Sequence, residues 1–441
     1  MDRNKLAWIG EALFSGYYVV VTRGYVPLFL ASVGMDIRDI LVITSFANAS
    51  CLLIALLINM LRHRIEKCDV RKLMIVSHGV ERIAWGLIPL AYASSLYALT
   101  IDYVIALGLT IPTAVFMNLT LLRTFDPESL KKIYAIRNSL SAVSSIIGQV
   151  VSIAIVAILP SALKYVYIYV LAMCMGLIGT LFLMFSSKPK IEMRIAEEEQ
   201  AIELSTPLFL FLVLFLASSS VIATAWGPYL MRVLHASEFI AASLGLVQTV
   251  TTIGASVFWC RQSYTRYRLA LAIAAVIPLI VALTPIPLLH LGLAAAYAVV
   301  FTGGNFLASF VFAELAQRMS VFRASILLTT AGVMGQSLGC GVAALVIGID
   351  PLMLFATASI FSVLALTIAF LCVPAVAVVP ENYVRMYART LHFISMSSYS
   401  FTIFIIKSYV VLTLRLLLVA TALLVLYTVY RMIYHLIQLI R

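Results

Sequence analysis

The sequence predicts an all-α membrane protein with twelve transmembrane helices in two six-helix halves, plus an extra C-terminal helix. Of the 441 residues, 63% are hydrophobic and only 11% are charged. Apolar runs of about twenty residues, long enough to cross a bilayer as a helix, recur along the whole chain. Unpaired backbone groups are costly in lipid and these runs are too long for barrel strands, so each run is expected to be helical.

Six apolar runs lie in each half of the chain. The first half contains the runs 6–33, 40–61, 73–96, 99–122, 139–159 and 163–185. The second half contains the runs 207–230, 239–260, 269–283, 288–315, 325–349 and 352–373. A further run at 409–434 predicts the extra helix, after a segment with arginines and aromatic residues at amphipathic spacing. We therefore expect an N-terminal bundle over 1–186, a cytoplasmic linker over 187–205, a C-terminal bundle over 206–373, and an amphipathic segment with an additional membrane helix over 374–441.

The basic residues predict the orientation of the chain, since Lys and Arg accumulate in loops that stay cytoplasmic. The connections between successive spans lie alternately on the two sides of the membrane. Those on one side carry nineteen basic residues, and those on the other carry three, namely Arg38, Lys164 and Arg232. The N-terminus of this multi-pass protein is therefore expected on the cytoplasmic side of the plasma membrane. The net charge of +11 follows from this asymmetry and from contact with membrane lipids. Nucleic acid is not needed as a partner.

No catalytic constellation, metal site or cofactor is predicted. The six cysteines stand singly, and the six histidines are scattered over loops and different helices without the companion groups that catalysis or metal binding requires. No phosphate-binding loop of the G-x-x-x-x-G-K-[ST] type is present, so ATP-driven pumping is not expected. The sequence therefore does not predict an enzyme.

The two halves share polar residues at nearly constant offsets, as an internal repeat would produce. Asn and Gln occur only fourteen times, so matching pairs are informative. Three pairs lie at offsets of 187 or 200 residues: Asn118 with Asn305, Gln149 with Gln336, and Asn48 with Gln248.

Twelve spans, two related halves and a longer central loop resemble the major facilitator superfamily over about 1–373. The usual signature of that family, a G-x-x-x-D-R-x-G-R-R turn after the second span, is matched in 59–72 only by Arg71 and Lys72. The resemblance implies a secondary transporter that moves a small-molecule solute by alternating access. It also implies that the first, fourth, seventh and tenth helices line a central cavity, flanked by the second, fifth, eighth and eleventh.

Nine residues are candidates for binding the solute, because polar groups inside a membrane are costly unless they have a partner. Six are the paired amides, for which interhelical hydrogen bonds of about 0.6 to 2 kcal/mol are the structural alternative. Arg23, about 25 Å along its helix, could either reach the outer interface or attract an anionic group. Trp226 and Tyr229 could line the cavity or belong to an interfacial aromatic belt.

Three charged residues are candidates for proton coupling or for a buried ion pair. Glu81 and Arg82 lie about 12 to 14 Å deep in a hydrocarbon core of about 30 Å. Neighbouring side chains on a helix point about 100° apart, so each is expected to need a partner from another helix, and Glu11 is the obvious partner for Arg82. A carboxylate that binds and releases a proton, and a fixed network that clamps the first half, both remain open. Few charges are expected in the cavity, which favours a neutral polar, amphipathic or apolar solute.

The alternative function is a membrane scaffold or accessory subunit that keeps the transporter fold without transport activity. The reduced turn motif favours this alternative, as does the extra C-terminal helix, which offers a surface for a protein partner.

Overall fold

The computed structural model describes residues 3–61, 64–65, 68–125, 127–159, 163–187, 206–259, 262, 264–316, 321–347 and 351–372. These residues form twelve long helices, which confirms the predicted all-α fold in that part of the chain. The predicted central linker, apart from residue 187, lies outside the described residues. The same holds for the amphipathic segment and the extra C-terminal helix.

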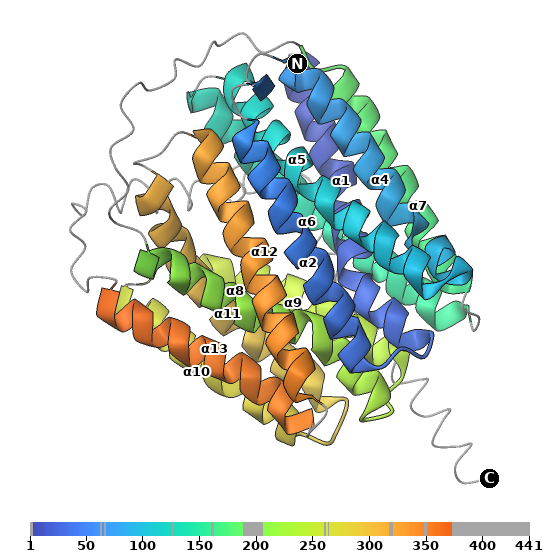
Figure 1. Ribbon diagram of the computed structural model, residues 1–441, viewed down its shortest axis with the longest axis vertical. Coiled ribbons are helices and arrows are strands. Elements are labelled where there is room, and N and C mark those ends of the chain that lie inside the picture. The colour runs from blue at the N-terminus through green and yellow to red at the C-terminus, as the bar shows by residue number, and fades with distance from the viewer. Residues whose placement is uncertain are drawn as a thin grey trace, which may run out of the picture.

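Each of the twelve apolar runs predicted before residue 374 coincides with one helix (Figure 1). The first half comprises α1 (Arg3–Ser32), α2 (Ile37–Met60), α4 (Val70–Ser94), α5 (Leu96–Thr124), α6 (Pro127–Ile158) and α7 (Leu163–Met184). The second half comprises α8 (Thr206–Arg232), α9 (Glu238–Trp259), α10 (Tyr264–Leu283), α11 (Leu289–Ala316), α12 (Val321–Val346) and α13 (Pro351–Cys372). In the described part of the chain, eleven helices are long and apolar enough to cross a membrane. The exception is α1, which carries Glu11 and Arg23.

The helices of the two halves pack in the same pattern. In the first half, α1 packs on α6 and α7, α4 packs on α5 and α7, and α2 packs on α5. In the second half, α8 packs on α12 and α13, α10 packs on α11 and α13, and α9 packs on α11. Each of these contacts therefore has a counterpart in the other half, as a duplicated six-helix unit requires.

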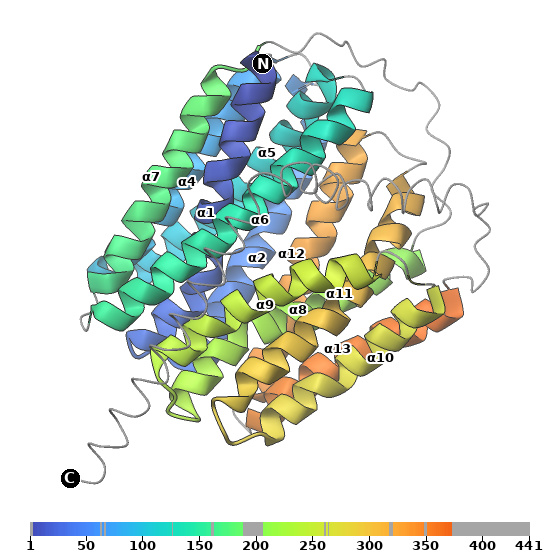
Figure 2. The same cartoon turned by 180° about the vertical axis from the view of Figure 1, so that it is seen from behind.

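The halves meet where α2 packs along α12, α6 on α9, and α1 on α8. Figures 1 and 2 show that the halves converge at one end and diverge at the end where α1 and α8 begin. Contacts near the converging end join the two halves directly. Ser45 Oγ of α2 donates to the Ser337 carbonyl of α12 at 2.8 Å, and Lys164 of α7 forms an ion pair with Glu238 of α9.

One close helix contact within the first half depends on glycine. A Cβ atom built at Gly16 of α1 would lie 2.3 Å from the Ser141 carbonyl oxygen of α6, a separation that real Cβ atoms do not show. Gly24 lies eight residues further along the same helix, and no atom lies within 4 Å of a Cβ built there. The pair therefore separates the effect of a side chain at this contact from the general effect of removing a glycine from a helix.

We expect Gly16→Ala to lower the free energy of unfolding by about 1 to 3 kcal/mol, because the α6 backbone must move to admit the methyl group. Gly24→Ala has no such clash and should gain up to about 1 kcal/mol from helix propensity. Thermal unfolding of the two purified variants checks this expectation. Equal melting temperatures for Gly16→Ala and Gly24→Ala would contradict the close contact between α1 and α6.

Candidate functional site

A cavity of about 750 Å³ lies between the two halves. Most of its wall comes from α1, α4, α5 and α6, and Thr249 of α9 and Thr329 of α12 complete it from the second half. The wall residues of α6 lie around the middle of that helix, from Arg137 to Ser145, and Thr329 lies in the first half of α12, toward the end where the halves diverge.

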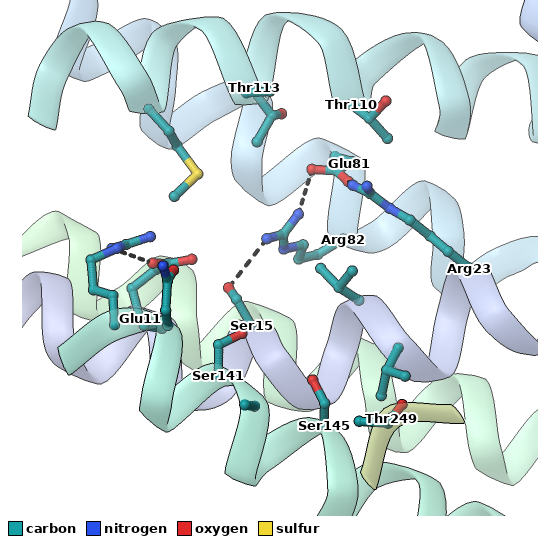
Figure 3. A pocket seen from close by; sticks show the side chains of 18 of the residues that line it. Glu11, Ser15, Arg23, Glu81, Arg82, Thr110, Thr113, Ser141, Ser145 and Thr249 are labelled. Carbon is teal, nitrogen blue, oxygen red and sulfur yellow. Dashed lines mark hydrogen bonds and ion pairs between the residues drawn. The ribbon is translucent and has the colours of Figure 1, made fainter. Parts of the chain in front are cut away.

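Charged side chains from three helices of the first half face this cavity (Figure 3). Figure 3 labels four of them, Glu11 and Arg23 of α1 and Glu81 and Arg82 of α4. The fifth is Arg137 of α6. The expectation of a sparsely charged cavity was therefore wrong. The sequence assigned Arg137 to a loop because the apolar run begins at Ser139, whereas α6 begins at Pro127. A proline at the first helical position is a helix-start signal that could have revealed the longer helix.

Glu81 is held by two arginines. Its Oε1 lies 2.9 Å from Arg23 Nη2, and its Oε2 forms a short ion pair with Arg82 Nη1. The pairing predicted between Arg82 and Glu11 was therefore wrong. Although neighbouring side chains leave the α4 backbone in different directions, both are long enough to bend to a common point. The Arg82 guanidinium also packs 4.1 Å from the centre of the Tyr18 ring.

Glu11 has a different set of partners. Its Oε2 lies 2.7 Å from Arg137 Nη1, and its Oε1 lies 3.4 Å from His78 Nε2. Arg137 also donates to the Trp8 carbonyl at 3.0 Å, which ties α6 to α1. Glu11, Glu81 and Arg82 are all buried, and the ion pairs that they form lie within the first half.

His78 lies between the two ion-pair groups. Its Nδ1 lies 2.8 Å from Thr180 Oγ1, whose single hydrogen is donated to the Gly176 carbonyl at 3.2 Å. Thr180 must therefore accept from Nδ1–H, which leaves Nε2 to accept from Arg82 Nη2 at 2.8 Å. This arrangement defines a neutral His78. Sequence reasoning set His78 aside as one of several scattered histidines, although its spacing of four residues from Arg82 places both on one face of α4.

The six predicted amides do not meet in one space. Gln149 donates to Thr249 Oγ1 at 3.0 Å across the two halves and lines a second cavity of about 230 Å³. Gln248 lines this cavity and a third of about 470 Å³, which Gln336 also lines. These three amides lie on helices that flank the interface between the halves.

The other three amides lie elsewhere. Asn48 is buried, and its amide donates to the Thr44 carbonyl of its own helix at 2.8 Å. Asn118 and the exposed Asn305 line none of the three described cavities. Of the six amides proposed to bind the solute, only Gln149, Gln248 and Gln336 therefore line a described cavity. Hydropathy locates a residue along its helix, but the rotation of that helix against its neighbours decides which way the side chain points.

The remaining candidates also divide between the cavities and the surrounding core. The Arg23 side chain lines the large cavity and is 42% exposed. Trp226 lines the second cavity and donates from Nε1 to His290 Nδ1 at 2.9 Å. Tyr229 lines none of the three cavities, and its hydroxyl donates to the Ala282 carbonyl at 3.3 Å.

The three cavities share part of their walls. Thr249 lines all of them, and Ala142 lines both the large and the third cavity. The charged surface of the first half therefore adjoins an uncharged surface from the second half. A solute between the halves would contact both.

No protein-family model matches the sequence, and no curated protein matches it. Several solved structures match the fold. The D-xylose–proton symporter matches with a TM-score of 0.64 and 15% identity over 84% of this chain and 97% of that chain. A bacterial homologue of the human lysosomal transporter Spinster, in an inward-facing and occupied conformation, matches with a TM-score of 0.60 and 15% identity over 84% and 95%.

The nucleoside transporter NupG matches with a TM-score of 0.57 and 15% identity over 85% of this chain and 98% of that chain. All three similar proteins are transporters and not enzymes. With the duplicated helix packing and the cavity between the halves, these matches show that this multi-pass membrane protein has the fold of the major facilitator superfamily transporters.

Proposed function

We propose that the protein is a secondary transporter that moves a small solute across the plasma membrane by alternating access. The observation that carries this proposal is the cavity of about 750 Å³ between the halves, which has a polar and charged wall. Its volume is typical of small-molecule sites, which span about 300 to 1,000 Å³. The similar folds of a sugar symporter and a nucleoside transporter support the same function.

The distribution of basic residues supports an inward-facing state with a cytoplasmic N-terminus. Lys164, and Arg232 at the end of α8, lie at the converging end of the halves, which the charge rule assigns to the outside. The large cavity then faces the cytoplasm. Transport requires the halves to separate at the converging end, where Lys164 pairs with Glu238 and Ser45 bonds to Ser337.

We extend the proposal to proton coupling at Glu11. Glu81 is bound by two guanidinium groups, so protonating it would remove the carboxylate from both Arg23 and the buried Arg82. Glu11 forms an ion pair with one guanidinium group, that of Arg137, so its protonation costs less. The proton would loosen the bond between α1 and α6 at Arg137, beside the cavity.

We expect an acidic exterior to drive accumulation of the solute by wild-type protein in proteoliposomes. Glu11→Gln cannot gain or lose the proton, so it should lose this accumulation while retaining exchange of solute across the membrane. Asp39→Asn makes the same change at an exposed carboxylate in the first turn of α2 and should behave as wild type. Uptake of sugars, nucleosides and organic acids, each with and without a pH gradient, measures both effects.

The scaffold alternative gives a different result in the same assay. It predicts no flux of any solute, together with stable copurification of another subunit. Saturable flux of one solute would exclude the scaffold alternative. Full proton-driven accumulation by Glu11→Gln would contradict the coupling role while leaving the transport function intact.

A further inference from the structure

We propose that the transported solute is an organic anion whose acidic group binds Arg23 and whose hydroxyl or N–H groups bind the hydroxyl oxygens of the same cavity. This inference rests on the proposed transport function and specifies the chemical class of its solute. It replaces the neutral or apolar solute that the sequence favoured. Its argument comes from the charge, exposure and hydrogen bonds of the cavity wall.

The described wall of the large cavity carries an excess positive charge. Three arginines line it, but they share only two carboxylates. Glu81 pairs with both Arg23 and Arg82, whereas Glu11 pairs with Arg137. His78 adds no charge in the tautomer that its hydrogen bonds define. One positive charge in this wall is therefore left for an anion to neutralise.

Arg23 and Arg137 are more exposed than the carboxylates with which they pair. The side chain of Arg23 is 42% exposed and that of Arg137 is 14% exposed, whereas Glu81 is 0% and Glu11 2% exposed. A guanidinium group carries five N–H donors in a planar fork, which suits two oxygens of a carboxylate or phosphate. Because Arg23 and Arg137 are more exposed than Glu81 and Glu11, an incoming solute meets these cationic groups first.

Three hydroxyl groups of the same wall are oriented to accept hydrogen bonds from a solute. Thr110, Thr113 and Ser145 donate to backbone carbonyls at 2.6, 2.7 and 2.9 Å. Each hydroxyl has one hydrogen, so its oxygen is left to accept from the solute. The wall therefore combines donors from arginine with acceptors from hydroxyls. A small organic acid that also carries hydroxyl or N–H groups satisfies both.

The adjoining third cavity suits the uncharged part of such a solute. Its described wall contains no charged side chain and combines the amides of Gln248 and Gln336 with two aromatic rings. The rings of Tyr297 and Phe301 are stacked with centroids 5.6 Å apart. Thr249 belongs to the walls of both cavities, so one solute can contact the two surfaces together.

Matched acids and amides test this assignment on the purified full-length protein. The first set is glucuronate, glucuronamide and glucose 6-phosphate, and the second is 4-hydroxybenzoate with 4-hydroxybenzamide. Binding is measured by equilibrium dialysis and by the shift in melting temperature. We expect at least one acid to bind and its uncharged counterpart to fail. Comparison of glucuronate with glucose 6-phosphate identifies carboxylate or phosphate as the preferred acidic group.

Substitution of Arg23 locates the acidic group. Arg23→Gln should weaken binding of the acid by about tenfold or more, since hydrogen bonds to charged groups are lost. Arg23→Lys keeps the charge but loses the planar fork, so its affinity should fall between those of the wild type and Arg23→Gln. Arg38→Gln removes the same charge from an exposed position on α2 and should bind as the wild type does.

Three results would overturn the assignment: amides that bind as tightly as the acids, no binding of any acid, or unchanged affinity in Arg23→Gln. Saturable transport of an amide without binding of its acid would overturn the anionic class and leave the transport function standing. Absence of flux for every solute, despite binding of an acid, would instead contradict transport.

Discussion

Glu81→Gln should destabilise the protein strongly, by about 3 to 5 kcal/mol, because it breaks a buried ion pair and leaves a buried cation behind. The Glu81 side chain is 0% exposed and binds two guanidinium groups. Arg23 is partly exposed and can find other partners, but the Arg82 side chain is only 3% exposed. Ser15, His78 and the face of the Tyr18 ring remain around Arg82, and none of these is an anion.

Thermal unfolding of the purified variant measures this effect, with Asp39→Asn as the matched control. The double variant Glu81→Gln, Arg82→Gln removes both charges and should recover part of the lost stability. Recovery would identify the unpaired charge of Arg82, and not the shape of the new side chain, as the cause. A melting temperature for Glu81→Gln equal to that of Asp39→Asn would contradict a structural role for this ion pair.

The fold could be predicted because lipid imposes one strong rule on sequence. Each membrane-crossing segment must satisfy its own backbone hydrogen bonds, so every long apolar run within the described residues is a helix. The predicted positions of the helix ends were less accurate, because polar residues can extend a helix beyond its apolar run. This error affected the predicted site at α6, because the longer helix includes Arg137, which forms an ion pair with Glu11.

The site was predictable only in part. Charged residues deep in an apolar run are expected to have polar or charged partners in the folded protein. Glu11, Glu81 and Arg82 indeed lie together beside the large cavity. Which atoms pair depends on helix rotation and on side-chain conformation, neither of which hydropathy determines. The same limit explains the amides, of which Gln149 lies at the interface whereas Asn305 is exposed away from the described cavities.

The second large effect concerns the converging end of the halves, which must open if the protein works by alternating access. A Cβ atom built at Gly341 of α12 lies 3.8 Å from Ser45 Cβ of α2. This separation matches the mean of about 3.8 Å between the Cβ atoms of a disulfide. Ser45→Cys with Gly341→Cys should therefore form a bond that joins the two halves and holds this end closed. The native cysteines would first be replaced, since Cys340 adjoins the new site.

Flux through this double-cysteine variant in proteoliposomes tests the central claim most directly, with uptake of the acid that binds most tightly as the measurement. We expect oxidation to reduce uptake to the level of empty vesicles and a reductant to restore it. Ser45→Cys alone should transport at the same rate after oxidation as after addition of the reductant. Undiminished uptake with the cross-link fully formed would contradict alternating access between the two halves.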